Sequence, residues 1–255
     1  MEDELFSELF GDEEDRHLEE HKNNTGQSID STLQALQHYI TRVKQLDRVT
    51  PHKEEFQVPG FALYRGALDP DLCNRYFDWL SSEYFSQTPQ LSSEHSQEPR
   101  LNQGMYFGNL NDNTALGYLA QLSQTLEELL PAKLCQREVM FDQAIINLYD
   151  SGEGIGDHID LLRFADGIVG FSFGSPATMR LRPVNASDRK RAAHYAEELH
   201  NDCANEVIVK IQPGDVYALS GDARLHWTHG FPTFIDGVSN VSGRRISVTL
   251  RKLHD

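Results

Sequence analysis

The sequence has few cysteines and no long apolar run, and both absences narrow the class of protein. Its three cysteines, Cys73, Cys135 and Cys203, are an odd number without the spacing of a metal site. Such a set favours a reducing, intracellular setting, cytoplasmic or nuclear, over a disulfide framework. No stretch approaches the roughly 18 consecutive apolar residues of a membrane span, and the start Met-Glu-Asp-Glu lacks the basic segment of a secretory signal. We therefore expect no membrane association and no secretion.

Positive charge is also scarce. The chain has 23 Lys and Arg against 39 Asp and Glu, a net charge of −16, which argues against a broad phosphate-binding surface. Half of this excess of negative charge lies in residues 1–56, which contain 14 acidic and 6 basic residues. A local basic groove is still compatible with this balance. The candidate phosphate contact is the cluster Arg189, Lys190 and Arg191 in a predicted helical insertion, and solvated surface is its alternative.

The chain has the length for one large domain behind an N-terminal tail. We predict that the acidic residues 1–28 are a disordered tail, with docking on a protein partner as an alternative suggested by Leu5, Phe6, Leu9 and Phe10. Residues 29–56 are predicted to form a helical segment and a linker, because apolar residues recur at helical spacing from Ser31 to Leu46. The main domain is predicted to span residues 57–255.

Within this domain the pattern changes from helices to short strands. Asp69-Pro70 is expected to begin a helix that runs through Leu80, and Leu116 to Leu130 a second one. After Met140, apolar runs separated by Gly, Pro, Asn and Asp predict an α+β, mainly β fold: a double-stranded β-helix, or jelly roll, with the N-terminal helices packed on one sheet. The expected strands are Ile145–Tyr149, Gly170–Phe173, Ala177–Leu181, Glu206–Ile211, Val216–Ser220, Leu225–Gly230 and Arg245–Leu250.

Two potential metal ligands, His158 and Asp160, lie two residues apart. In an extended segment their side chains point to the same side, so they could bind one ion. Alone the pattern is weak, because a surface histidine beside a solvated aspartate is common. Downstream, His226 and His229 compete for the role of third ligand. In a strand they point in opposite directions, so only one of them can face the ion.

The C-terminal stretch alternates strictly between polar and apolar residues. Ile246, Val248 and Leu250 would share the apolar face of a strand; the other face would carry Arg245, Ser247, Thr249 and Arg251. Guanidinium groups are rarely buried without an anion, so two arginines on one face suit a binding site for a dicarboxylate. A charged edge strand is the alternative.

Together these motifs resemble the AlkB family of iron(II)/2-oxoglutarate dioxygenases. The resemblance rests on order and spacing: Asn147-x-Tyr149, His158-x-Asp160, His229-Gly230 and Arg245-x-Ser247-x-Thr249-x-Arg251. It covers roughly Pro59 to Leu253. In finer detail, the branch that hydroxylates transfer-RNA wobble uridines is most similar in Gly152-x-Gly154-Ile155-x-x-His158-Ile159-Asp160 and Trp227-Thr228-His229-Gly230.

The resemblance implies a role for each motif and makes residues 57–255 the catalytic domain. His158, Asp160 and His229 would bind iron(II) as the catalytic centre and leave three adjacent coordination positions open. The co-substrate 2-oxoglutarate would be bound through its distal carboxylate by Arg245, Asn147 and Tyr149, with Arg251 near its other end. With dioxygen, the family converts 2-oxoglutarate to succinate and hydroxylates a substrate C–H bond, which releases formaldehyde from an N-methyl group.

Some features leave alternatives open. Zinc competes for the same ligands, although a zinc hydrolase has no obvious use for the two arginines. Ser247 replaces the asparagine that is common in the family at its position. Leu162 stands where base-repair members often carry an acidic residue, which argues against direct repair of methylated adenine or cytosine.

The substrate is the least determined part of the prediction. Met105, Tyr106 and Phe107 could stack on a flipped base, although they could equally be ordinary strand and core residues. We predict a nucleic-acid base as the substrate, with RNA, in particular transfer RNA, favoured over DNA. The alternatives are a protein hydroxylase or demethylase of the same mechanism and a non-catalytic binding module.

Overall fold

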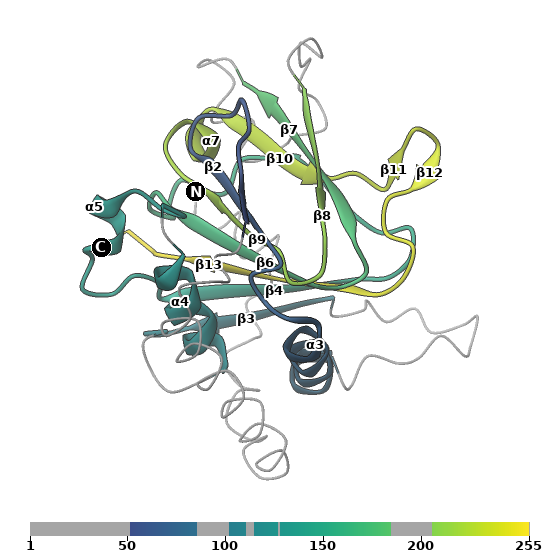
Figure 1. Cartoon of the computed structure of the whole chain (residues 1–255), viewed down its shortest axis with the longest axis horizontal. Coiled ribbons are helices and arrows are strands. Elements are labelled where there is room, and N and C mark those ends of the chain that lie inside the picture. The colour runs from purple at the N-terminus through teal and green to yellow at the C-terminus, as the bar shows by residue number, and fades with distance from the viewer. Residues whose placement is uncertain (1–51, 86–101, 111–114, 127, 185–205, 255) are drawn as a thin grey trace, which may run out of the picture.

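Two facing antiparallel sheets form the body of the molecule. The computed structural model describes residues 52–85, 102–110, 115–126, 128–184 and 206–254. A seven-stranded major sheet has the order β1-β2-β9-β6-β13-β4-β3, and a four-stranded minor sheet has the order β5-β10-β7-β8. Figure 1 shows helices α3 and α4 on one side of the major sheet and the minor sheet on the other side. This is the predicted jelly roll, mainly β with helices packed on one sheet.

The elements have the following bounds. The major sheet contains β1 (His52–Glu54), β2 (Phe61–Arg65), β3 (Gln103–Phe107), β4 (Gln143–Tyr149), β6 (Ile168–Gly174), β9 (Val216–Leu219) and β13 (Arg245–Arg251). The minor sheet contains β5 (Ile155–His158), β7 (Ala177–Pro183), β8 (Val207–Ile211) and β10 (Trp227–Phe231). A small hairpin is formed by β11 (Phe234–Ile235) and β12 (Val238–Ser239). The described helices are α3 (Pro70–Phe85), α4 (Ala115–Thr125), α5 (Ala132–Cys135) and α7 (Asp222–Leu225).

The helix that begins after Asp69 starts where predicted and runs beyond the predicted end at Leu80 to Phe85. The Asp69 carboxylate accepts a hydrogen bond of 2.9 Å from the backbone N–H of Leu72, and Pro70 occupies the first helical position, where its missing N–H does no harm. The second helix is shorter than predicted. It ends at Thr125, Glu128 beyond it has a positive φ of 54°, and α5 is a separate turn after Pro131.

Two further boundaries differ from the sequence-based expectation. His52–Glu54, assigned to a linker, pairs with β2 as an edge strand, and Glu54 forms an ion pair of 2.6 Å with Arg65. The strand expected from Leu225 begins at Trp227, because the short helix α7 ends at Leu225 and His226 caps it. The predicted tail, the helix at 31–46 and the basic insertion lie outside the described residues. Within the described residues, no helix combines the length and apolarity that a membrane crossing requires.

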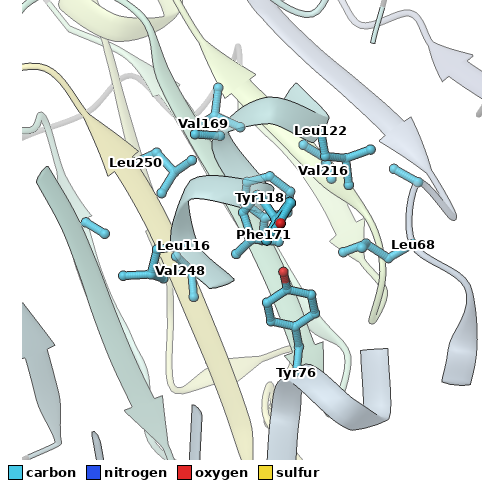
Figure 2. Packing of buried hydrophobic residues seen from close by; sticks show 14 of the residues in the cluster. Leu68, Tyr76, Leu116, Tyr118, Leu122, Val169, Phe171, Val216, Val248 and Leu250 are labelled. Carbon is cyan, nitrogen blue, oxygen red and sulfur yellow. The ribbon is translucent and has the colours of Figure 1, made fainter. Parts of the chain in front are cut away.

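The hydrophobic core has two parts, one on each face of the major sheet. The first lies between this sheet and helices α3 and α4, and Figure 2 shows Tyr76, Phe171 and Val248 within it. Tyr76 stacks on Phe173 with ring centroids 5.5 Å apart. The second part lies between the two sheets and includes Met179 and Leu219. The apolar face of β13 packs against the helices, so its polar face points between the sheets, as the alternation predicts.

Candidate active site

Three predicted ligands come together between the sheets. One potential ligand atom from each of His158, Asp160 and His229 lies within 4.8 Å of the other two. His158 on β5 and His229 on β10 are paired directly across the two strands, and their ring centroids are 4.5 Å apart. Asp160 follows β5, and one of its carboxylate oxygens lies 3.6 Å from Nε2 of His158. Two imidazoles and one carboxylate are therefore available to one ion.

A ring nitrogen of His158 is free for a metal ion, and His229 has the neutral charge state that a metal ion needs. Nδ1 of His158 lies 2.9 Å from the carbonyl oxygen of Gly156; as a donor to it, Nδ1 leaves Nε2 free to bind a metal. Burial and the neighbouring His158 lower the pKa of His229 to about 3, which keeps that ring neutral. For His158, loss of solvation opposes protonation, but Asp160 raises its pKa overall.

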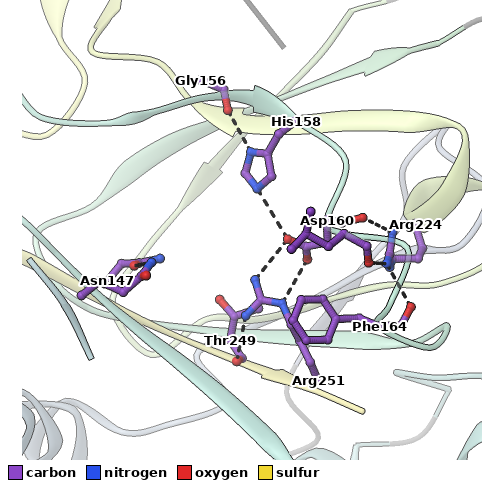
Figure 3. A network of polar contacts seen from close by, with 10 residues as sticks. Asn147, Gly156, His158, Asp160, Phe164, Arg224, Thr249 and Arg251 are labelled. Carbon is purple, nitrogen blue, oxygen red and sulfur yellow. Dashed lines mark hydrogen bonds and ion pairs between the residues drawn. The ribbon is translucent and has the colours of Figure 1, made fainter. Parts of the chain in front are cut away.

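Asp160 is held from two sides by arginines, as Figure 3 shows. Arg251 donates from Nε and Nη2 to the two carboxylate oxygens over 3.3 and 3.2 Å. Arg224 donates to the backbone carbonyls of Asp160 and Leu161 over 3.0 and 2.8 Å, and also to Phe164. Burial alone would raise the pKa of Asp160, but the Arg251 charge holds it well below its usual range. The carboxylate is thus ionised and fixed in orientation.

His226, the rival ligand, lies outside this cluster. Its Nδ1 is 2.9 Å from the Asp222 carboxylate one helical turn earlier, and its side chain is 42% exposed. The structure therefore places His229, and not His226, beside His158 and Asp160.

Arg245 lies at the other end of the same face of β13. It is fully buried; its Nε donates to Ser172 over 3.1 Å, whereas Nη1 and Nη2 have no hydrogen-bond partner among the described residues. The guanidinium stacks on Phe231 at 4.0 Å and lies 5.2 Å from the ring of Tyr149. Burial lowers the pKa of Arg245. Two orphaned donors of a buried guanidinium fit a carboxylate, because each would gain a charge-assisted hydrogen bond.

The neighbouring strand β4 contributes the other two predicted co-substrate residues. Tyr149 lies directly opposite Arg245, and Asn147 directly opposite Ser247, so all four share one face. Burial raises the pKa of Tyr149, so its hydroxyl stays protonated. Asn147 accepts a hydrogen bond of 2.7 Å from Gln103. Ser247, which replaces the usual asparagine, lies on the same face directly opposite Asn147.

The structure separates the three residues predicted to stack on a base. All lie on β3, where neighbours point to opposite faces. Tyr106 packs against the core beneath the helices, away from the site. Met105 and Phe107 share the face of Asn147 because they pair with Ile145 and Gln143, and Phe107 is 53% exposed. Three consecutive strand residues cannot present their side chains to one base.

Several site residues escaped the reasoning from sequence. Arg224, Ser172 and Gln143 carry no motif. Ser172 and Gln143 reach the site because β6 and β4 pair with β13, and Arg224 reaches it from the short helix α7. Tyr217 on β9 lies across Gly170, where a Cβ would come within 2.0 Å of the ring. Burial raises the pKa of Tyr217 to about 12, so its hydroxyl stays neutral near the charge of Arg245. An alternation analysis of β4 and β6, extended over their whole length, would have found Gln143 and Ser172.

The residues fit the metal and co-substrate that the motifs imply. Two imidazoles and a carboxylate on one side of an ion suit a divalent transition metal with open positions. Arg245, Tyr149 and Asn147 would hold the far carboxylate of 2-oxoglutarate, and Arg251 fixes the metal-binding carboxylate. When bound, iron(II) and 2-oxoglutarate supply the oxidising chemistry that hydroxylates a C–H bond. The protein's own part is to orient ligands, to keep His229 neutral and Asp160 ionised, and to exclude water from Arg245.

Comparisons with known proteins agree with this geometry. The family model of the 2OG-Fe(II) oxygenase superfamily matches residues 60–251. The "Alkylated DNA repair protein ALKBH8 homolog" of Arabidopsis thaliana is 33% identical over 120 residues, which cover 45% of this chain and 35% of that protein. "Uncharacterized protein L905" of Acanthamoeba polyphaga mimivirus is 27% identical over 137 residues, or 52% of this chain and 57% of that one. The chain thus spans less than two thirds of either relative.

Among solved structures, OsALKBH1 has the same fold. It aligns with a TM-score of 0.51 at 15% identity, over 79% of this chain and 100% of that one. The resemblance to AlkB oxygenases that the motifs predict is confirmed. The chain belongs to the 2OG-Fe(II) oxygenase superfamily, the dioxygenases that use iron(II) and 2-oxoglutarate.

Proposed function

We propose that this dioxygenase hydroxylates or oxidatively demethylates a nucleic-acid base, with RNA, in particular transfer RNA, favoured over DNA. The observation that carries the proposal is a pair of residues on the strands next to Arg251. Phe107 on β3 and Gln143 on β4 lie directly opposite each other, and Gln143 is also opposite Arg251, which holds Asp160. Phe107 is 53% exposed, whereas Gln143 is fully buried.

These two side chains match the two recognition features of a base. The exposed ring of Phe107 offers a stacking surface, and stacking on an aromatic side chain contributes about 1 to 3 kcal/mol per base. Neither amide atom of Gln143 has a hydrogen-bond partner among the described residues. A carboxamide presents one donor and one acceptor in a plane, as does the edge of a base. A flipped base bound to both would lie next to the metal centre.

The preference for RNA rests on the motifs. The segments around His158 and His229 resemble the transfer-RNA branch of the family, and the position two residues after Asp160 is the exposed, uncharged Leu162. A leucine offers no acceptor to the exocyclic amine of adenine or cytosine. The Arabidopsis relative is named for alkylated DNA, so DNA belongs in every test. Placement in the cytoplasm or nucleus, where RNA is present, is part of the proposal.

The test compares nucleosides from cells that lack the gene with those of the parent by mass spectrometry, alongside assays of the purified protein with iron(II) and 2-oxoglutarate. Phe107→Leu should raise the KM for RNA about 5- to 150-fold and leave 2-oxoglutarate turnover without RNA unchanged. Phe234→Leu, which alters an exposed ring on β11, is the matched control. Activity on proteins with unaltered nucleosides would favour the protein hydroxylase. If the protein did not turn over 2-oxoglutarate, the alternative of a non-catalytic binding module would be supported.

A further inference from the structure

A buried ionic cluster lies on the outer face of the minor sheet, directly behind the metal ligands. Asp157 is the residue before His158 on β5, so its side chain points away from the metal site. The Asp157 side chain is only 4% exposed. It is not part of the metal-ligand motif, and it lies behind the strand rather than in the site. A buried carboxylate must be paired, and its partners identify its role.

The main partner is Arg180 on β7. Its Nε lies 3.1 and 2.9 Å from the two Asp157 oxygens, and its Nη2 lies 2.8 Å from one of them. Arg182 adds a weaker contact of 3.4 Å and also binds Glu206. This forked pairing fixes both the distance and the orientation of the carboxylate. Since β10 lies between β5 and β7, the ion pair spans three strands.

Gly230 on β10 makes the span possible. It is in register with Arg180, and a Cβ at Gly230 would lie 2.6 Å from Asp157 Oδ1 and 2.9 Å from the Asp157 backbone. Any side chain there would collide with Asp157. Arg180 therefore reaches Asp157 across the one position of β10 where a side chain is absent, immediately after the ligand His229. This close approach explains why a glycine follows His229 in this chain.

The strand that carries His158 has little else to hold it. β5 is four residues long, lies at the edge of its sheet, and pairs with β10 at His158 and Ile155 with an irregularity between them. Edge strands with few ladder bonds open easily. The Asp157–Arg180 ion pair clamps β5 to the sheet one residue from the His158–His229 pair.

We propose that Asp157, Arg180 and Gly230 are positioning residues that hold His158 opposite His229 and so set the affinity for the metal. Loss of residues that orient metal ligands commonly lowers metal affinity about 10- to 100-fold. The proposal rests on His158, Asp160 and His229 as the ligands and is independent of the substrate. If the ion pair only stabilised the fold, its loss would lower the resistance to unfolding without altering metal affinity in the folded protein.

The chain offers a matched control for that distinction. Asp215 is equally buried, with 2% side-chain exposure, and pairs with Arg65 over 2.7 Å. It also accepts hydrogen bonds from the backbone of Gly66 and Gln212, in the turn that precedes β9. None of these residues touches a metal ligand. Asp215→Asn therefore removes a comparable buried charge away from the site.

The experiment measures manganese(II) affinity by electron paramagnetic resonance and thermal unfolding of the metal-free protein. Asp157→Asn, Arg180→Met and Gly230→Ala should each weaken manganese binding about 10- to 100-fold, and Arg180→Lys should recover part of the loss. Asp215→Asn should lower the unfolding temperature and leave manganese affinity within about twofold. The visible absorption spectrum of bound cobalt(II) should change in the Asp157, Arg180 and Gly230 variants and not in Asp215→Asn.

Two results would overturn the proposal. The first is manganese affinity unchanged in Arg180→Met and Asp157→Asn while both lose as much thermal stability as Asp215→Asn. The second is equal loss of manganese affinity in all variants, including the control. Because no substrate is present, neither result depends on whether the protein acts on RNA.

Discussion

The two sides of the active site are built on strands that differ in how completely they are paired and buried. β13, which carries Arg245 and Arg251, is buried along its whole length and pairs in continuous register with β4 on one side and β6 on the other. β5, which carries His158, is a short edge strand with one neighbour. The proposed co-substrate side is thus part of the core, whereas one metal ligand depends on a clamp. Rigidity in this site is distributed unequally.

That difference has a mechanistic consequence. A fully paired central strand holds Arg245 in place before any ligand arrives, so little ordering is needed when a carboxylate binds. The metal side gains order on binding, because an ion ties β5, the Asp160 segment and β10 together. The largest effects of mutation should therefore come from the ligands, and smaller ones from the residues around them.

The largest expected effect is the loss of the metal centre. His158→Ala, Asp160→Ala and His229→Ala should each abolish succinate formation from 2-oxoglutarate, because the ion loses one of three protein ligands. His226→Ala is the matched control, since that imidazole pairs with Asp222 at the surface. Equal inactivity of His226→Ala and His229→Ala, with both proteins folded, would contradict the ligand assignment.

The next effect separates the two sides of the site. Arg245→Ala should weaken 2-oxoglutarate binding by one to two orders of magnitude, since charge-assisted hydrogen bonds contribute about 1.5 to 3 kcal/mol. Manganese affinity should be nearly unchanged. Arg244→Ala, which removes an exposed arginine paired with Asp150, is the neighbouring control. Calorimetric titration of both variants tests this; an unchanged 2-oxoglutarate affinity in Arg245→Ala would place the dicarboxylate elsewhere.

Gln143, in the major sheet, is expected to lower the stability of the protein while contributing to RNA binding. Both of its amide atoms are buried and unpaired among the described residues, and an unsatisfied buried polar group costs about 1 to 3 kcal/mol. Gln143→Leu should therefore raise the free energy of unfolding while weakening RNA binding. Gln103→Leu removes an amide that donates to Asn147 and should therefore lower the free energy of unfolding. Denaturant titration gives both values, and a less stable Gln143→Leu protein would refute the reasoning.

A subtler effect sharpens the comparison between β13 and β5. Manganese binding should slow hydrogen exchange in residues 155–160 far more than in residues 245–251, because β13 is already protected by two full ladders. Exchange mass spectrometry of the metal-free and metal-loaded protein provides the measurement. Equal gains in the two segments would mean that the sides of the site do not differ in rigidity.

The smallest effect is expected at the N-terminus. Deleting residues 1–25, with ten acidic residues against Arg16 and Lys22, should leave succinate formation intact because no proposed ligand lies there. Removing that charge should strengthen RNA binding at low salt, with the gain fading as salt screens the interaction. Gel-shift titrations at two salt concentrations suffice. Loss of turnover after truncation would show that the predicted tail belongs to the catalytic domain.

Local patterns were enough to predict the face of each residue in β13. The strict alternation of Arg245 to Arg251 determines which side chains point between the sheets. The choice of His229 over His226 came from the glycine that follows His229 in the family motif, and the structure places His229 with the other two ligands. The same rule, had it been applied to Gln103–Phe107, would have separated Tyr106 from Met105 and Phe107. Helix α3 was predictable because Asp69 and Pro70 mark its start.

What could not be predicted depends on which distant strands become neighbours. The Asp157–Arg180 pair requires β5, β10 and β7 to lie side by side in one register, and no local pattern encodes that adjacency. Arg224 looks like an ordinary charged residue of a short helix, yet it is buried against three backbone carbonyls of the Asp160 segment. The boundary at Leu225 was missed because α7 interrupts an otherwise strand-like run.

The most direct test of the account is a diffraction experiment on crystals grown without oxygen in the presence of manganese(II) and 2-oxoglutarate. Anomalous scattering at the manganese edge locates the ion, and the electron density locates the co-substrate. The account predicts one ion bound by His158 Nε2, the Asp160 carboxylate and His229, with the distal carboxylate of 2-oxoglutarate on Arg245. An ion bound by His226, or a 2-oxoglutarate whose distal carboxylate lies away from Arg245, would contradict it.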